Sequence, residues 1–587
     1  MTAQPDSKDL ARCWLYFLET ALSNRSAPLL RHLLKGDSYW RDVLCLRDDI
    51  GWEHGGRHIA SSLLDLGPPA PLSRLRLAEG LAEPRRVDRI GRDVLEVFFD
   101  FDCTRGYGRG VARLIVDDSA PAGARLWSLL TSMCGSPAFP DAARGSRHPG
   151  VGYDRRDTAR NWLDHRAARA SYTDHDPEVL IVGGGHAGLS VAARLQAVGV
   201  DVLVVDRHAQ IGDNWRRRYK SLALHSKADV VAFPYLPFPT TFPTYIPKDR
   251  FANWLATYVD ALDLNYWPST DFMKGRYNAA RCEWEVKVRT GTDAQRVLRP
   301  RHVVLATGME GGEPHVPSLP GLGSFRGNVL HTATYEGGSS FSGQRVLVVG
   351  TASSGHDVAQ DLHHHGAKVT MLQRSPTTVI SLESSHRFFA AYTSGATIEE
   401  ADLLNAIGFI HPLLVEALQA ATVTTNKVDE ELHRGLERAG FRVDDGEDHT
   451  GYIMKLFRYG GRYYINVGCS DLIVAGDIAI LQYADLKEFV AAGAQMVDSS
   501  VQEFDTVILA TGYANMQEQA RRFFGDDIAG RVGKVGGFDS CLEYGNLYKP
   551  TAQDRLWFAG GGIPTARFYS LGLALMIRAD LDGLSSH

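Results

Sequence analysis

The sequence predicts an α/β protein with two similar strand–turn–helix units, preceded by a separate α+β module. Apolar strand-like runs lead into glycine-rich turns twice, at Gly183 and at Gly350. Between them lies a short segment, residues 325–335, that centres on His331. Residues 1–170 lack the strand–turn–helix pattern, which is why we expect them to form a module of their own.

The N-terminal module is predicted from its hydrophobic spacing. Residues 10–34 carry apolar side chains at helical intervals, whereas residues 94–101 and 112–116 alternate as strands do. Helices followed by antiparallel strands are typical of an α+β arrangement. The Arg-rich stretch 144–176 is expected to link this module to the rest of the chain.

The first glycine turn carries a complete dinucleotide-binding pattern, so residues 177–343 are expected to begin a Rossmann-like domain. Gly183 permits the tight turn, Gly185 lets the backbone approach a pyrophosphate, and Gly188 lets helix and strand pack closely. An acid, Asp206, ends the next strand, where it can accept hydrogen bonds from ribose hydroxyls. The residues expected to contact this nucleotide are Gly183, Gly185, His186, Ala187, Gly188, Asp206 and Arg207.

The second turn departs from the pattern, because Ala352 stands where the middle glycine belongs. Its methyl group would hold a pyrophosphate slightly outward, which suits a loosely held, exchangeable nucleotide. The second strand ends in Gln373 and Arg374 without an acid, which favours NADPH over NADH, since a guanidinium can pair with a 2′-phosphate. A solvated Arg374 is the alternative. The expected contacts are Gly350, Ala352, Ser353, Ser354, Gly355, Arg374 and Ser375.

These units define the expected domain boundaries. The second nucleotide domain should span residues 344–475 and include a helical insertion at about 398–439. The first domain is expected to resume over residues 476–587, its sheet continuing with the strand at 505–512. Two dinucleotides bound by one chain imply electron transfer, most simply from a nicotinamide to a flavin.

Composition restricts the function classes further. The chain has 587 residues, 44% of them hydrophobic, and a net charge of −6, so nucleic acid is a poor partner. No apolar run reaches the length of a membrane span, and we expect a cytoplasmic protein. The seven cysteines include no Cys-x-x-Cys, which argues against a disulfide scaffold, a redox-active dithiol and a zinc site. No metal site is therefore predicted.

Several motifs together resemble the flavin-containing monooxygenases, a family of class B flavoprotein monooxygenases. Phe325-x-Gly327-x-x-x-His331-x-x-x-Tyr335 is similar to their fingerprint and to the core shared with Baeyer–Villiger monooxygenases, which usually continue with Trp-Pro. The segments 212–215, 224–227, 233–239 and 245–248 also resemble this group, including the plant auxin-forming arylpyruvate enzymes. The resemblance covers about residues 177–580. The N-terminal module is similar to the extension of type II members and is expected to have a SnoaL-like (NTF2-like) fold.

The resemblance implies an enzyme that uses FAD, NADPH and O₂, with NADH as the alternative nucleotide. One oxygen atom would pass from a C4a-(hydro)peroxyflavin to a small organic substrate, by N- or S-oxygenation or by Baeyer–Villiger oxidation. The alternatives are oxidative decarboxylation of an arylpyruvate and an NAD(P)H oxidase that releases hydrogen peroxide. A homodimer is a further expectation, and the N-terminal module is either a cap or dimer contact that shapes substrate access, or a passenger.

The resemblance also places further site residues. Asn214, Trp215, His225, Thr511, Gly512 and Tyr513 are expected near the flavin or in the segments that link the two domains. The catalytic candidates are His225, His331 and Arg567. For His331 the resemblance favours a hinge between domains over direct chemistry. For His225 a structural loop histidine is the alternative, and for Arg567 an ordinary salt bridge.

Overall fold

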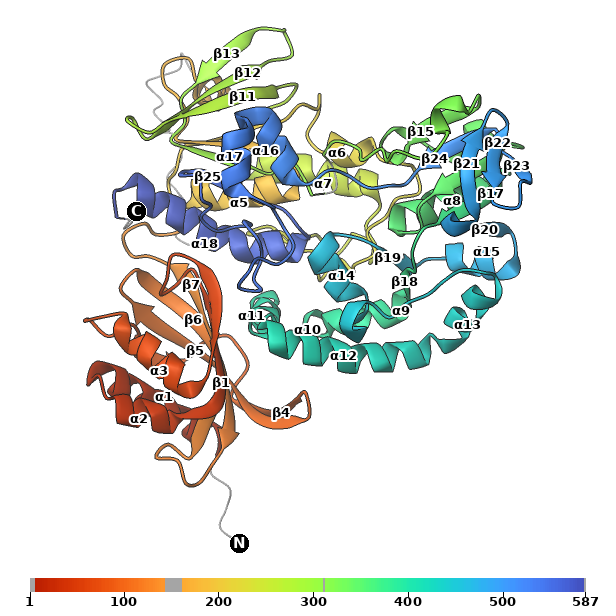
Figure 1. Cartoon of the computed structure of the whole chain (residues 1–587). Helices are drawn as coiled ribbons and strands as arrows, with labels where there is room; N and C mark the ends of the chain where they lie inside the picture. The colour runs from red at the N-terminus through yellow and green to blue at the C-terminus, as the bar shows by residue number, and fades with distance from the viewer. Residues whose placement is uncertain (1–5, 143–160, 310–311, 585–587) are drawn as a thin grey trace.

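The computed structural model describes residues 6–142, 161–309 and 312–584 (Figure 1). Three sheet-based parts are arranged around a set of helices contributed by residues 382–475. A single hydrophobic cluster runs through the N-terminal module, the first nucleotide domain and the helices α11 (Ile398–Gly408) and α12 (His411–Val428) of the helical insertion. The second nucleotide domain has two further clusters of its own, one of which also includes α13 and α15. The N-terminal module therefore shares its core with the first nucleotide domain.

The N-terminal module is a mixed seven-stranded sheet with helices on one side, as the α+β prediction required. Its path is β2-β1-β7-β6-β5-β3, with β4 paired to β5; β1 and β7 are parallel and the other pairs antiparallel. The strands are β1 (Leu34–Val43), β2 (Ile50–His54), β3 (Ser73–Leu77), β4 (Arg85–Arg89), β5 (Arg92–Cys103), β6 (Gly106–Val116) and β7 (Ala124–Gly135). The helices are α1 (Ser7–Ser23), α2 (Ala27–Leu33) and α3 (Gly56–Asp65).

The opposite side of this sheet faces the rest of the chain (Figure 1). Strands β6 and β7 contact α11, and β7 also contacts α18. Of the predicted linker, residues 143–160 lie outside the described residues. Its later part forms α4 (Trp162–Ser171), which starts with a capping box between Asn161 and Asp164.

The first nucleotide domain has a parallel five-stranded sheet in the order β10-β9-β8-β14-β25. Its strands are β8 (Val179–Val182), β9 (Val202–Val205), β10 (Asn265–Trp267), β14 (His302–Leu305) and β25 (Leu556–Phe558). The accompanying helices are α5 (His186–Ala197), α6 (Asp213–Arg216), α7 (Lys248–Ala261), α16 (Met516–Phe524), α17 (Asp526–Val532) and α18 (Ile563–Leu581). A small antiparallel sheet joins them: β11 (Asp271–Asn278), β12 (Glu283–Arg289) and β13 (Gln295–Leu298).

The second nucleotide domain has a parallel five-stranded sheet in the order β15-β24-β16-β17-β20. Its elements are β15 (Asn328–His331), β16 (Arg345–Val349), α8 (Ser353–His364), β17 (Lys368–Gln373), β20 (Ile478–Gln482) and β24 (Thr506–Leu509), with the small sheet β21 (Leu486–Val490), β22 (Gly493–Met496) and β23 (Val501–Glu503).

The expectation that the strand at 505–512 continues the first sheet is wrong. Strand β24 lies between β15 and β16 of the second sheet, and β25 completes the first. Asp505, just before β24, holds it there by accepting hydrogen bonds from the backbone and guanidinium of Arg345 at the start of β16.

The helical insertion begins after β18 (Thr378–Ser381), which pairs with β19 (Tyr463–Asn466). It contains α9 (Leu382–Ser385), α10 (Ala390–Thr393), α11 (Ile398–Gly408), α12 (His411–Val428), α13 (Glu430–Arg438), α14 (Gly451–Tyr459) and α15 (Cys469–Ala475). Among the described residues, no single helix is long and apolar enough to span a membrane. Helices α11 and α12 pass that test only as a pair, bent by 104°.

Candidate functional site

One large cavity lies where the first nucleotide domain, its linking segments and the helical insertion meet. Its volume is about 1670 Å³, larger than the 300–1,000 Å³ typical of a pocket for one small molecule. The predicted site residues that line it are Gly183, Gly185, His186, Ala187, Asp206, Arg207, Asn214, Trp215, His225 and Tyr513. Residues more than 300 positions apart therefore share one cavity.

The first glycine turn is shaped for a ligand at one position. Gly183 has a φ of +109°, and a Cβ there would lie 2.4 Å from the carbonyl oxygen of Ala306. A Cβ on Gly188 would lie 2.1 Å from the oxygen of Gly183, so both glycines are required by the chain itself. At Gly185, by contrast, the nearest atom is the side-chain amide nitrogen of Asn214 at 3.1 Å. The space beside Gly185 thus faces the cavity at the N-terminus of α5, where a phosphate group is favoured.

Asp206 lies at the end of β9 and ties the turn to the next loop. Its carboxylate accepts hydrogen bonds from the Gly184 amide at 2.7 Å and from the backbone and ring of His208 at 2.8 and 2.7 Å. Burial by itself raises the pKa of Asp206, but these hydrogen bonds outweigh it and hold the pKa below its usual value. The charged carboxylate retains acceptor capacity for a ribose hydroxyl.

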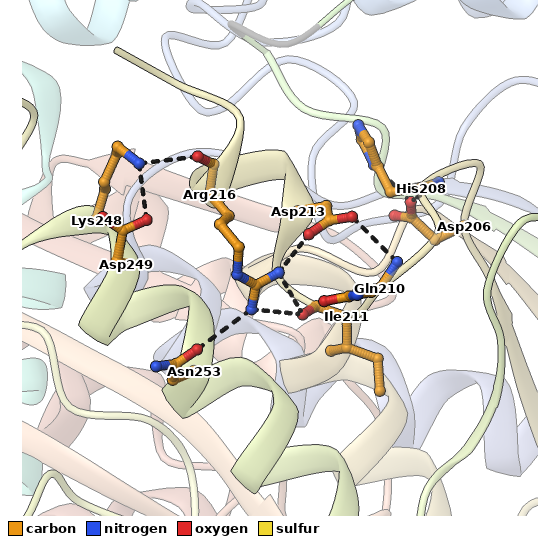
Figure 2. A network of polar contacts seen from close by, with 9 residues as sticks. All are labelled: Asp206, His208, Gln210, Ile211, Asp213, Arg216, Lys248, Asp249 and Asn253. Carbon is orange, nitrogen blue, oxygen red and sulfur yellow. Dashed lines mark hydrogen bonds and ion pairs between the residues drawn. The ribbon is translucent and has the colours of Figure 1, made fainter. Parts of the chain in front are cut away.

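The loop that carries Asn214 and Trp215 is fixed by a polar network (Figure 2). The guanidinium of Arg216 pairs with Asp213 and reaches Asn253 of α7 at 3.3 Å. The ammonium of Lys248, a buried group, donates to the carbonyl of Arg216 at 2.8 Å. The Trp215 ring packs edge-on against Phe251, with centroids 4.8 Å apart. The loop therefore presents its side chains to the cavity from a braced position.

The second glycine turn repeats the first in outline. Gly350 has a φ of +114°, and a Cβ on Gly355 would lie 2.1 Å from the Gly350 oxygen. Ala352 caps α8 with nearly the same backbone angles as Gly185, so its methyl group occupies the position that is open in the first turn. Ser353 donates to the carbonyl of Tyr463, and neither it nor Ser354 lines the large cavity.

Arg442 lies beside Arg374, the residue predicted to bind a 2′-phosphate. Arg374 and Ser375 are exposed just after β17. The buried amide of Gln373 binds the backbone of Arg442 in both directions, at 2.8 and 2.9 Å, and Arg442 donates to the Arg374 carbonyl at 2.9 Å. Sequence reasoning missed Arg442, because it follows α13, 68 positions away.

His331 ends β15, next to the segment that links the domains. Its Nδ1 accepts the Ala333 amide at 3.0 Å, and its ring packs edge-on against Tyr513 at 5.5 Å. Burial lowers its pKa, and His331 does not line the cavity, although Ala333 and Tyr513 do. Thr511 donates to the carbonyl of His315, and Gly512 has a φ of +79°. This placement favours the hinge interpretation of His331.

Two of the predicted site residues that line the cavity, His225 and His186, are histidines that differ in their contacts. His225 lines the cavity in a partly buried loop. The ring of His186 contacts the carbonyl of Gly561 at 2.8 Å, and burial lowers its pKa. Gly561 and Gly562 precede α18, so the N-termini of α5 and α18 meet at the same part of the cavity.

Arg567, expected near flavin or substrate, has a structural role instead. It forms a buried pair with Asp402 of α11, at 2.8 and 2.6 Å, and donates to the carbonyls of Val230 and Ala232. Asp402 neutralises its charge, two backbone carbonyls engage a further donor group, and Arg567 does not line the cavity. This geometry favours the salt-bridge alternative for Arg567.

The helical insertion supplies an apolar part of the cavity that sequence reasoning missed. We call it the apolar lobe. It is lined by Phe388, Phe389, Tyr392, Leu404, Phe409, Leu414, Leu418, Ile453, Leu456, Phe457, Tyr544, Phe568 and Tyr569. Tyr544, Phe568 and Tyr569 come from the first nucleotide domain and the others from the insertion. For the insertion, only helical spacing indicated these positions, and that spacing is equally typical of an ordinary core.

Comparison with known proteins also indicates a flavin-dependent monooxygenase. The family model described as flavin-binding monooxygenase-like matches residues 176–526. Indole-3-pyruvate monooxygenase YUCCA1 of Oryza sativa subsp. japonica is 33% identical over 352 residues, 60% of this chain and 80% of the relative. The probable indole-3-pyruvate monooxygenase YUCCA4 of Arabidopsis thaliana is 31% identical over 57% of this chain and 75% of its own length.

Solved structures show the fold. An NADP⁺-bound cyclohexanone monooxygenase variant from Rhodococcus sp. Phi1 superposes with a TM-score of 0.50 at 18% identity, covering 70% of this chain and 87% of that one. The family model matches more than half of the chain, and its residues contain both glycine turns and the His331 segment. The chain therefore belongs to the flavin-binding monooxygenase family and is an oxidoreductase.

Proposed function

We propose that this protein uses FAD and NADPH to transfer one oxygen atom from O₂ to an uncharged, aromatic or otherwise apolar substrate. The observation that carries this proposal is the continuity of the cavity, which joins the Gly185 turn to the apolar lobe. When bound, the flavin supplies the redox chemistry: NADPH reduces it and it activates O₂. The protein supplies binding, orientation and exclusion of water.

The residues of the first turn fit FAD. The open space at Gly185 and the N-terminus of α5 suit the pyrophosphate, and the Asp206 carboxylate suits a ribose. The volume of the cavity leaves room for a substrate beside a bound dinucleotide. The segment Gly560–Gly562 and the N-terminus of α18 would then border the flavin ring.

The residues of the second turn support NADPH. The guanidinium groups of Arg374 and Arg442 lie on adjacent exposed segments, and two cations suit a phosphate dianion. The methyl of Ala352 would hold a pyrophosphate outward, as an exchangeable cosubstrate needs. The contact between His331 and Tyr513, at the junction of the two domains, supports a hinge role for His331 in this proposal.

The apolar lobe argues for an uncharged substrate. Its residues are aromatic or aliphatic, and burial of such surface favours an apolar ligand by about 25 cal/mol per Å². Asp402, a charged side chain of the insertion that lines the cavity, is neutralised by Arg567. A thioether, an amine in its neutral form or a ketone meets these conditions, and an apolar lobe also keeps water from the reacting atoms.

An arylpyruvate is the second candidate. The relatives named indole-3-pyruvate monooxygenases at 31–33% identity favour it, and the lobe suits an aryl group. Its carboxylate would have to lie toward the cationic loop near Arg218 and Lys220, which also lines the cavity.

The test is a substrate panel under NADPH and O₂: thioanisole, N,N-dimethylaniline, phenylacetone and phenylpyruvate, with n-butylamine as a small polar control. We expect one NADPH and one O₂ consumed for each sulfoxide, N-oxide or ester formed. Release of CO₂ from phenylpyruvate alone would establish the second candidate. Hydrogen peroxide in place of product with every compound would refute the oxygenase proposal and identify an oxidase.

A further inference from the structure

A single side chain of the N-terminal module enters the wall of the apolar lobe. Arg41 lies on β1 and has no exposed surface. Its Nε and Nη2 donate to the carboxylate of Glu543, both at 2.7 Å, and its Nη1 donates to the carbonyl of Ala406 at 2.8 Å. Nη2 also donates to the hydroxyl of Tyr569 at 3.0 Å. The guanidinium thus joins three segments that are far apart in the chain.

The groups held by Arg41 face the lobe on their other side. Ala406 of α11, Tyr569 of α18 and Phe409 all line the cavity. The Phe409 ring lies under the Arg41 guanidinium, 5.0 Å from centroid to Cζ, and stacks on the cavity residue Tyr544 at 4.5 Å. Arg41 therefore contacts the back of the same surface that a substrate in the lobe would contact from the front.

The buried charges of Arg41 and Glu543 compensate each other. Although burial lowers the pKa of Arg41, the charge and hydrogen bonds of Glu543 raise it above its ordinary value. Glu543 is as buried as Arg41, so either group without the other would be an uncompensated charge in the interior. A planar guanidinium with five N–H donors can serve three acceptors at once, which a lysine cannot do with the same geometry.

Two buried arginines hold helix α11 at points one turn apart. Arg567 of α18 pairs with Asp402, one turn before the carbonyl that Arg41 binds. The wall of the lobe is thereby positioned jointly by the nucleotide domain and by the N-terminal module. The passenger hypothesis for residues 1–170 does not account for a buried side chain that makes four hydrogen bonds at this place.

We propose that Arg41 is a positioning residue for the substrate lobe, so that the N-terminal module is a working part of the oxygenase site. The inference rests on the proposed function in one respect: that the substrate occupies the apolar lobe. Arg41 itself does not line the cavity. It sets the places of Tyr569, Phe409 and α11, and through them the fit of the substrate and the exclusion of water.

Three variants of the flavin-loaded, full-length enzyme test this. Arg41→Lys keeps the charge but removes the fork of donors, and Tyr569→Phe removes only one hydrogen bond without leaving a buried charge. The control is Arg109→Ala, which breaks a 2.9 Å ion pair between the same module and Glu399 of α11 but contacts no cavity residue. Flavin content and unfolding temperature are measured first for each.

We expect Arg41→Lys to raise the KM for thioanisole about tenfold, the effect of losing one buried hydrogen bond to a charged group, while the KM for NADPH changes less than about twofold. Tyr569→Phe should shift the same way by a smaller factor. Both should increase the hydrogen peroxide released per NADPH, whereas Arg109→Ala should not. The inference would be overturned if folded, flavin-loaded Arg41→Lys and Tyr569→Phe both kept the wild-type KM for thioanisole and the wild-type amount of hydrogen peroxide released per NADPH.

A second measurement separates this inference from the proposed function. Hydrogen exchange of residues 398–409 reports the order of the wall without any substrate. We expect faster exchange there in Arg41→Lys and Tyr569→Phe than in Arg109→Ala. If the wild type does not oxygenate thioanisole, the substrate proposal fails; unchanged exchange and unchanged substrate-free peroxide release would overturn the role of Arg41 in either case.

Discussion

Substitution of Gly185 by valine tests the flavin site most directly. At this position the backbone has φ −80° and ψ −177°, an extended conformation that any residue adopts. An added Cβ meets only the Asn214 amide, at 3.1 Å, and that side chain can move. The folded chain should therefore tolerate valine. The pyrophosphate should not, because the isopropyl group fills the space that we assign to it.

Forcing extra methyl groups into a close contact costs about 1–3 kcal/mol. Since a phosphate against the backbone leaves no room for relaxation, we expect the upper end, about 3 kcal/mol, or FAD binding weakened about 150-fold. The assay is the ratio of flavin to protein after purification, followed by titration of the apoprotein with FAD. Circular dichroism checks the fold.

The matched control is Gly188→Ala, in which a Cβ would lie 2.1 Å from the backbone oxygen of Gly183. Here the chain itself is obstructed, so this variant should be destabilised or insoluble rather than folded and colourless. A soluble Gly185→Val enzyme with full flavin content and wild-type FAD affinity would refute the assignment of the first turn.

Three further outcomes are expected. Arg374→Ala should raise the KM for NADPH about 30-fold, the effect of losing a charge-assisted pair, and leave that for NADH nearly unchanged; equal effects would disprove 2′-phosphate recognition. Burial lowers the pKa of His356 to about 4 while the unfolded chain keeps an ordinary imidazole pKa of about 6.5, so stability is lost as pH falls from 6.5 towards 4. Between pH 7 and pH 5 this effect should lower the unfolding free energy of the wild type by about 2 kcal/mol. His356→Phe keeps an aromatic ring stacked on Tyr464 and should not show this decrease. The same pH dependence in both proteins, measured by urea titration, would contradict the reasoning. Deletion of residues 1–170 should cause aggregation or divert NADPH into hydrogen peroxide, since it uncovers Glu543; a truncated enzyme with unaltered oxygenation would show that the module is a passenger.

The predictions that succeeded depend on short stretches of chain. Each glycine turn, at Gly183 or at Gly350, is followed directly by its helix, and Asp206 lies about two dozen positions after Gly183. A left-handed φ and a helix N-terminus are properties of a few neighbouring residues, so the pattern of residue types indicates them. The same reasoning places Arg374 at the end of β17 but does not reveal what else lies beside it.

The predictions that failed concern partners distant in the chain. Strand β24 has the apolar pattern of either parallel sheet, and only its neighbours decide which one it joins. The sequence shows only that Arg567 is a charged residue that follows a glycine-rich segment. Whether its guanidinium contacts a ligand or pairs with Asp402 depends on where α11 packs.

Sequence by itself determined that two glycine turns are present, and that the first leaves open at Gly185 the space that the methyl group of Ala352 fills in the second. The reason is that the backbone geometry that a phosphate requires is encoded locally by glycine, alanine and their neighbours. Tertiary structure alone decided what surrounds the reacting groups. The apolar lobe and the contact of Arg41 with Glu543, 502 positions away, arise only when helices and sheets pack. Their physical reason is shared: burial of apolar surface and neutralisation of buried charge are properties of the assembled interior and not of any one segment.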